Sequence, residues 1–169
     1  IEMDENIPGA HDIQGRIGAY WHGNEPCHHI AFLYNQLGQP WKCQKWIRTI
    51  ASHFYGDEPG SLSGNDDCGQ MSAWYIFACM GFYPVAPSSN VYSIGSPCVK
   101  AMKLKLSNGK MIEMIADNWS SRNIYVKELY VNGKKHTSSY LKYDDVCNGV
   151  KLRFVMSGKP NYKRGLDSN

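Results

Sequence analysis

The sequence lacks several patterns that would place it in a familiar functional class. None of its six cysteines forms a C-x-x-C pair, which excludes the commonest zinc and thioredoxin-type signatures. An even number of cysteines permits disulfides without showing them, and Cys79 lies in an apolar run where a free, buried thiol is expected. No apolar run reaches the ~18 residues of a membrane-spanning helix, and the longest, residues 71–82, is typical of a buried helix.

Positive charge is scattered rather than concentrated. The 169 residues include 18 Lys and Arg and 15 Asp and Glu, which gives a net charge of +3. This distribution argues against a nucleic acid as the main partner. The content of 43% hydrophobic and 20% charged residues is ordinary for a globular protein with a core. The chain begins with Ile1 and its first ten residues show no signal peptide, so we expect a piece of a longer protein.

The first half of the chain has helical periodicity. Apolar residues recur at spacings of three and four between Pro40 and Gly56, which predicts an amphipathic helix. Residues 68–82 leave almost no polar face, which is typical of a helix enclosed by others. These helices are too few to enclose it, so we expect further helices upstream. A shorter helix is predicted in residues 28–38, with one apolar side formed by Ile30, Leu33, Tyr34 and Leu37.

The second half has the period of two that is typical of strands. Two prolines and two serines break the helical pattern in residues 83–90. Beyond them apolar and charged residues alternate in residues 102–106, and the Asn-Gly pairs at 108–109 and 132–133 predict tight hairpins. A later alternating run at 150–156 adds another strand. This half therefore predicts an antiparallel β-sandwich of roughly eighty residues.

Two adjacent carboxylates stand at the mouth of the apolar helix, in "GNDDCGQMSAW" at residues 64–74. A structural explanation is helix capping, in which Asp66 or Asn65 accepts hydrogen bonds from first-turn amides. Capping does not explain the second carboxylate, Asp67. We expect a helix N-terminus to favour its anionic form, which suits a general base better than a general acid.

A second polar segment, "YWHGNEPCHH" at residues 20–29, combines aromatic, amide, carboxylate and histidine side chains. Such loops suit sugars, whose C–H faces stack on rings while their hydroxyls need several hydrogen-bond partners. The alternative is a polar loop whose glutamate is satisfied within the protein. A nucleophile formed by Cys27 and a neighbouring histidine is weakly indicated, because adjacent residues do not show a shared geometry. Equally weak is a zinc site formed by His22, His28, His29 and Cys68.

Three long stretches resemble one family. "GNEPCHHIAFLYNQLGQPWKCQKWIR" and "GNDDCGQMSAWYIFACMGFYPVAPSSNVYSIGSP" resemble the end of the catalytic domain of glycoside hydrolase family 92, the calcium-dependent exo-acting α-mannosidases. The tail "LYVNGKKHTSSYLKYDDV" resembles the C-terminal β-sandwich of that family. Long ungapped motifs of this kind are far more specific than short patterns with wildcards.

The resemblance implies an α+β fold in two units. Residues 1–86 would form the last helices of an (α/α)6 barrel, and residues 87–169 an antiparallel β-sandwich. The implied reaction is the inverting, Ca²⁺-dependent removal of terminal mannose from N-glycans or mannans. Mannose-containing glycans and the upstream remainder of the catalytic domain are the expected partners. Such substrates imply an extracellular or, in a bacterium, a periplasmic location.

The resemblance also assigns roles to individual residues. The position of Asp67 holds the general base that activates water. The position of Asn65 holds a second acid in some members of the family, so that Asn65 departs from their pattern. Asn24 and Glu25 match the loop at the sugar and calcium site, and Asp66 is assigned to substrate binding beside them.

An inverting glycosidase also needs a general acid, about 6.5–9.5 Å from the base. We find no match to the acid-bearing motif of the family, so we expect the acid to lie upstream of this chain. The chain alone would then be inactive, although its parent would be an enzyme. The alternative is a non-catalytic module that binds carbohydrate or serves a structural role, because a fold alone does not assign a function.

Overall fold

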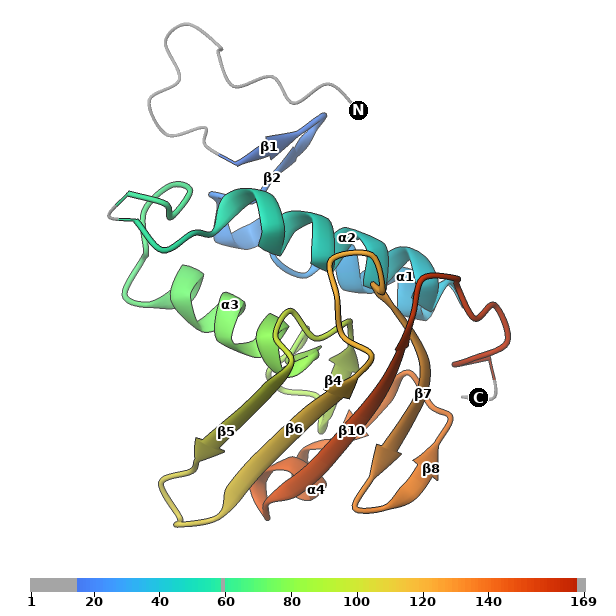
Figure 1. Ribbon diagram of the computed structural model, residues 1–169. Coiled ribbons are helices and arrows are strands. Elements are labelled where there is room, and N and C mark those ends of the chain that lie inside the picture. The colour runs from blue at the N-terminus through green and yellow to red at the C-terminus, as the bar shows by residue number, and fades with distance from the viewer. Residues whose placement is uncertain (1–14, 59, 167–169) are drawn as a thin grey trace, which may run out of the picture.

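The computed structural model describes residues 15–58 and 60–166. The helices of the first half lie at one end of a five-stranded sheet, with α2 running across that end and α3 beside it, whereas α4 lies toward the other end (Figure 1). The part of the predicted barrel unit before residue 15 lies outside the described residues. The helical elements are η1 Glu25–Cys27, η2 Ile30–Phe32, α1 Leu33–Gln36, α2 Pro40–Phe54, α3 Gln70–Met80 and α4 Tyr143–Cys147.

The long amphipathic helix is confirmed as α2. Proline is well placed at its first position, where the missing N–H would have no helical partner. The helix ends two residues before Gly56 and buries its apolar stripe against the neighbouring elements. The buried apolar side chains are Pro40, Cys43, Ile47, Ile50, Ala51 and Phe54.

The apolar side predicted for residues 28–38 is wrong. The segment forms the 3₁₀ turn η2 followed by the short helix α1, and the 3₁₀ turn winds more tightly than an α-helix. The change of winding rotates the buried face onto Phe32 and Asn35, which are 1% and 4% exposed. Ile30 and Leu37 are instead 41% and 67% exposed.

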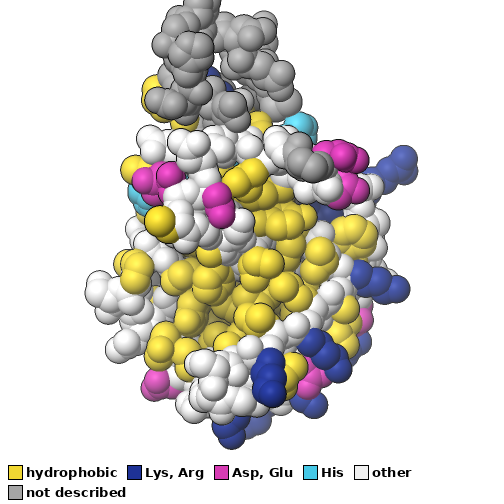
Figure 2. Space-filling model, turned by 90° about the vertical axis from the view of Figure 1, so that its left-hand side faces the viewer, with side chains coloured by type: hydrophobic (Ala, Val, Ile, Leu, Met, Phe, Trp, Pro, Cys, Tyr) yellow, Lys and Arg dark blue, Asp and Glu magenta, His cyan; other side chains and the backbone are white. Residues whose placement is uncertain are grey.

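The helix α3 is confirmed, but the described residues do not enclose it. Met71, Trp74 and Ala78 are buried on one side, whereas Ile76 is 40% exposed on the helix. Hydrophobic side chains gather across the middle of the face shown in Figure 2. An exposed apolar surface of this kind is typical of a contact face.

The strands form two main sheets and a small ribbon. A five-stranded sheet has the order β5-β6-β10-β7-β8, a three-stranded sheet has the order β3-β4-β9, and β1 pairs with β2. Their bounds are β1 Arg16–Ile17, β2 Tyr20–Trp21, β3 Phe82–Tyr83, β4 Val91–Ile94, β5 Ala101–Lys105, β6 Met111–Asp117, β7 Tyr125–Val131, β8 Lys134–His136, β9 Tyr140–Lys142 and β10 Val150–Ser157.

Both predicted Asn-Gly hairpins are confirmed, since β5 pairs with β6 and β7 with β8 in antiparallel fashion. The prediction of a purely antiparallel second half is wrong, because β10 pairs with β6 in parallel. The reason is the connection: the chain passes through β7, β8, β9 and α4 before β10 returns alongside β6. Apolar residues alternate in the same way in parallel and in antiparallel strands, so the sequence pattern could not reveal the parallel pairing.

Several contacts cross the predicted boundary between residues 86 and 87. The strand β3 lies before the boundary but pairs with β4 beyond it. Asn35 donates a hydrogen bond of 2.8 Å to the carbonyl oxygen of Ile94, and the amide of Val126 donates one of 3.0 Å to Gln44 Oε1. The side chains of Asn35 and Gln44 are both buried, so polar bonds as well as apolar packing join the helices to the sheets.

All six cysteines are free, and Cys79 is buried as predicted. Among the described residues, no helix combines the length and the apolar character that crossing a bilayer requires.

Candidate active site

The two polar segments singled out in the sequence meet at a close backbone contact. A Cβ atom placed on Gly64 would lie 2.5 Å from the carbonyl oxygen of Gly23, which is well inside contact distance. Gly64 also has a φ of +73°, in the left-handed region that glycine tolerates. The loop before α3 and the loop before η1 can therefore touch only because Gly64 has no side chain.

This contact brings together Glu25, the first residue of η1, and Asp67, three residues before α3. Both residues are exposed. A hydrogen bond to the Glu25 carboxylate is the main cause that raises the pKa of Asp67, and desolvation and the charges of Glu25 and Asp66 raise it further. Asp67 precedes the helix and faces another carboxylate, so its pKa is raised and not lowered as a helix N-terminus alone would do.

The backbone around Asp67 is in an uncommon conformation. Asp67 and Cys68 have φ values of 46° and 57°, and Gly69 follows at 93°. Left-handed residues other than glycine cost free energy, and such residues cluster at functional sites. The turn projects the Asp67 side chain toward η1 instead of into the first turn of α3.

Helix capping by Asp66 is confirmed. Its Oδ1 atom accepts hydrogen bonds of 2.9 Å from both the amide and the hydroxyl of Ser72, which lies in the first turn of α3. The carboxylate therefore satisfies a free helix amide. The exposed Asn65 takes no part in this cap, and its role as the position of a second acid stays a prediction.

The structure gives His28 a role that the sequence did not reveal. Its Nε2 atom lies 3.0 Å from the carbonyl oxygen of His22, and Gln70 Nε2 lies 3.2 Å from its Nδ1 atom. Trp74 donates a 3.2 Å hydrogen bond to the carbonyl oxygen of His28. Gln70 and Trp74 belong to α3. His28 thus links the segment that carries Glu25 to the helix that follows Asp67.

A second histidine of residues 20–29, His22, is held by hydrogen bonds to two tyrosines. Tyr55 donates from its hydroxyl to the carbonyl oxygen of Met71 at 3.1 Å, so it accepts the 2.6 Å bond from His22 Nε2. The remaining nitrogen, Nδ1, then accepts the 2.8 Å bond from the Tyr20 hydroxyl. His22 is fully buried, and burial lowers its pKa to about 3. The ring is therefore a neutral structural element.

These bonds leave the weaker alternatives without support. His22 and His28 use their nitrogens within the protein, whereas Cys68 is exposed on the loop before α3. Within residues 15–58 and 60–166, no three His, Cys, Asp or Glu side chains are arranged to hold a metal ion.

The fit to calcium is accordingly incomplete. Carboxylate and amide oxygens such as those of Glu25 and Asn24 are of the type that Ca²⁺ prefers, but the ion takes 6–8 oxygen ligands. The backbone of Asn24 closes the turn into η1 through a 3.0 Å bond from the Cys27 amide. The described residues thus offer oxygen donors of the type that Ca²⁺ prefers but too few of them to form a calcium site.

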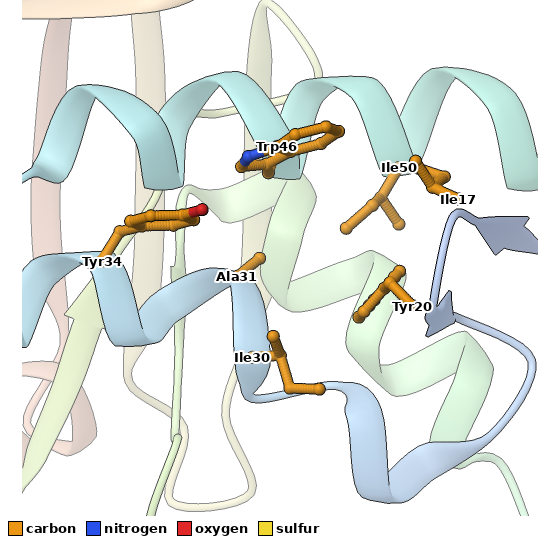
Figure 3. A pocket seen from close by; sticks show the side chains of 7 residues that line it. All are labelled: Ile17, Tyr20, Ile30, Ala31, Tyr34, Trp46 and Ile50. Atoms are coloured by element: carbon orange, nitrogen blue, oxygen red, sulfur yellow. The ribbon is translucent and has the colours of Figure 1, made fainter. Parts of the chain in front are cut away.

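An apolar groove of about 190 Å³ lies between α2 and the segment of η2 and α1, where the side chains in Figure 3 converge. Its walls are mostly apolar and offer few groups for the hydroxyls of a sugar. The groove is lined by Ile17, Tyr20, Ile30, Ala31, Tyr34, Trp46 and Ile50.

Comparisons with known proteins agree on one family. The sequence model described as "Glycosyl hydrolase family 92 catalytic domain" matches residues 2–158. A family GH92 alpha-mannosidase from Bacteroides thetaiotaomicron, solved in complex with mannoimidazole, is 74% identical with a TM-score of 0.93, covering 99% of this chain and 22% of that chain. An inverting mannosidase of family GH92 from the same organism is 39% identical with a TM-score of 0.79, covering 88% of this chain and 20% of that one.

A curated relative points the same way. An uncharacterized secreted glycosidase from Arthroderma benhamiae is 32% identical over 150 residues, which are 87% of this chain and 19% of the relative. The chain thus spans about a fifth of the length of the relatives it matches. Since the family match covers nearly the whole sequence, the chain belongs to glycosyl hydrolase family 92, in which it forms part of the catalytic domain.

Proposed function

We propose that this chain supplies the general base of an inverting exo-α-mannosidase that removes terminal mannose from N-glycans or mannans. The observation that carries the proposal is the exposed pair of Glu25 and Asp67, which a shared hydrogen bond joins across two loops. The solved relative that binds mannoimidazole and the relative described as inverting support the substrate class and the stereochemistry.

The raised pKa of Asp67 suits the role of a base. A carboxylate whose pKa is closer to the working pH accepts a proton more readily than an ordinary aspartate. Once ionised, Asp67 can take a proton from water as the water oxygen attacks the anomeric carbon of mannose. The glycosidic bond breaks in the same step, and the leaving oxygen takes a proton from an acid on the opposite side.

The acid and the rest of the site would come from other parts of a longer protein. The relatives are about five times the length of this chain, which leaves ample sequence for them. The partly exposed apolar side of α3 and the groove beside α2 support packing against further helices. Residues 1–86 would then complete an (α/α)6 barrel, and residues 87–169 would form the adjoining β-sandwich.

Asn24 and Glu25 would contribute oxygen ligands to a calcium ion beside the sugar, with other ligands from the substrate, water and the upstream part. Asp66 and Asn65 border the same site, where Asp66 would stabilise the loop that contacts substrate. The secreted relative supports an extracellular or periplasmic location for the whole protein.

The test is mannose release from α-1,2-mannobiose by the intact protein that contains this chain. Asp67→Asn is compared with wild type, and Asp57→Asn serves as the matched control because Asp57 is exposed in the loop between α2 and α3. We expect Asp67→Asn to lower kcat by at least about a hundredfold with mannoside binding retained. NMR of the first product should show β-mannose in wild type.

Equal turnover by wild type and Asp67→Asn would contradict the assignment of the base. An α-mannose first product would contradict inversion. Mannoside binding without any turnover by wild type would favour the non-catalytic module. Loss of turnover on chelation and its recovery with Ca²⁺ would support the calcium ligands.

A further inference from the structure

A basic cavity lies far from the carboxyl pair. It has a volume of about 220 Å³ and forms where the segment after β10 folds against β7 and β8. Figure 1 shows β8 and the C-terminal end on one side of the molecule and α3 on the other. A water molecule occupies about 30 Å³ in the liquid, so the cavity has room for a larger polar group. Four basic side chains line it: Lys127, Lys135, Lys163 and Arg164.

The central feature of this cavity is Arg164, which is only 7% exposed. Its Nη2 atom donates a 3.3 Å hydrogen bond to the carbonyl oxygen of Ser138, but its Nε and Nη1 atoms have no hydrogen-bond partner. Burial lowers the pKa of Arg164 to about 10, which still leaves the side chain charged at neutral pH. A buried cation with unused donors is costly unless an anion accompanies it.

The negative charge present in the cavity is already engaged. Glu128 accepts hydrogen bonds of 2.9 Å from Lys135 Nζ and from the Tyr130 hydroxyl. Among the described residues, no salt bridge joins Lys127, Lys163 or Arg164 to a carboxylate. Among the described residues that line this cavity, positive charge therefore exceeds negative charge.

The backbone that carries these cations is held in place. Asn161 donates a 3.0 Å bond to the carbonyl oxygen of Lys127 and accepts a 3.1 Å bond from the amide of Lys163. The amide of Gly165 donates a 3.1 Å bond to the carbonyl oxygen of Thr137. The backbone positions from which these cations extend are thus fixed before a ligand binds, which lowers part of the entropic cost of binding.

We propose that this cavity binds a phosphate-class oxyanion, either free phosphate or sulfate or the same group esterified to a sugar. A tetrahedral oxyanion carries negative charge on several acceptor oxygens, which suits the point charges of lysines. The Nε and Nη1 atoms of Arg164 are shielded from solvent, so its buried charge attracts the anion electrostatically, while the exposed Lys127 and Lys163 supply the contacting donors. This site is independent of the proposed mannosidase activity.

The test is calorimetric titration of the intact protein with sodium phosphate, sodium sulfate and sodium chloride at constant ionic strength. The first variant combines Lys127→Gln and Lys163→Gln, two exposed positions where folding should be preserved. Lys105→Gln is the matched control, because Lys105 lies on β5 at the opposite edge of the same sheet. A second variant, Arg164→Met, tests the buried charge.

We expect phosphate and sulfate to bind and chloride not to bind. The double lysine variant should weaken phosphate at least about tenfold, while Lys105→Gln leaves it unchanged. No phosphate binding by the wild type, or equal affinity in the wild type and a folded double variant, would overturn the proposal. If Arg164→Met fails to fold, the lysine variants decide the outcome.

Mannose 6-phosphate, titrated in parallel, distinguishes the two sources of the anion. Tighter binding than inorganic phosphate, lost in the double lysine variant, identifies a sugar ester as the ligand. Equal binding of the two identifies the free anion. The readout is heat of binding, so a protein without mannosidase activity would still give a clear answer.

Discussion

The exposed carboxyl pair and the buried histidine pair share the segment of residues 20–29, which holds Glu25 and both histidines, yet their environments differ completely. Glu25 and Asp67 are open to solvent, and Asp67 has a raised pKa because its neighbour is acidic. His22 and His28 are 0% and 1% exposed, and burial lowers the pKa of both. The titratable residues of this region therefore form two groups. The exposed carboxyl pair, the reactive layer, can exchange protons, and the buried histidine pair, the supporting layer, fixes the geometry.

The largest effect should come from forcing the two loops apart. In Gly64→Ala the new Cβ would lie 2.5 Å from the carbonyl oxygen of Gly23, so Glu25 and Asp67 should separate. We expect kcat/KM for mannoside hydrolysis to fall about a hundredfold, as misplacement of catalytic groups by an ångström does.

Gly109→Ala is the control for this change. Gly109 has a φ of +80°, similar to that of Gly64, but nothing lies within 4 Å of its missing Cβ. Both variants should lose about 1–2 kcal/mol of unfolding free energy from left-handed strain. An equal loss of activity in the two variants would show that the close contact is unimportant.

The next effect separates the supporting layer from the reactive one. His28→Leu removes the bonds to the His22 carbonyl and to Gln70, so the His22 carbonyl loses this donor, whereas Gln70 keeps its 3.0 Å bond to the Tyr83 hydroxyl. We expect the unfolding free energy to fall by about 1–3 kcal/mol and kcat to fall as Glu25 drifts from Asp67. His29→Leu, at the half-buried neighbouring position, is the control in urea unfolding and in turnover. A positioning role would be refuted if both variants lost stability but kept full kcat.

A smaller effect concerns the reactive layer alone. Because Glu25 raises the pKa of Asp67, Asp67 takes up its proton at a higher pH than an ordinary aspartate as the solution is acidified. Glu25→Gln removes that charge, so the acidic limb of the kcat/KM profile should move to lower pH. Glu58→Gln, at an exposed loop position, should leave the limb in place. An unmoved limb in Glu25→Gln would mean that the pair is not coupled during catalysis.

The smallest effect at neutral pH concerns His22. Its folded pKa of about 3 lies below its ordinary value of 6.5, so only the unfolded chain takes up this proton between those values. The stability that neutral His22 contributes is complete above pH 6.5 and is lost as the pH falls toward 3.

Urea unfolding of the wild type, His22→Gln and His53→Gln at neutral pH and at about pH 4 measures this dependence. His53 is exposed on α2 and serves as the control. His22→Gln is expected to be less stable than the wild type at neutral pH but to lose less on acidification. The same loss in all three proteins would argue against a buried neutral His22.

Local patterns predicted much of the fold. The apolar period and Pro40 located α2, the Asn-Gly pairs located both hairpins, and the cap of α3 was narrowed to Asp66 or Asn65, of which the structure selects Asp66. Each depends on residues within a few positions of one another. The apolar side of residues 28–38 could not be predicted, because one turn of 3₁₀ winding shifts every later side chain.

For the site, too, local sequence predicted the residues but not their contacts. The motifs singled out both Glu25 and Asp67, but they are 42 positions apart by number, and no periodicity reveals that their carboxyl groups share a hydrogen bond. The anchoring bonds of His28 were missed for the same reason. Two adjacent histidines look equivalent in sequence, and only burial against Trp74 distinguishes His28 from its neighbour.

The sequence by itself determined the family, the helix α2, the hairpins and the capped start of α3, because local propensity and contiguous motifs specify them. Tertiary structure alone decided the parallel pairing of β6 with β10, the neutral burial of His22 and the raised pKa of Asp67. These properties depend on which distant groups surround a residue. A pKa follows from the local dielectric and nearby charges, and the folded chain brings those together.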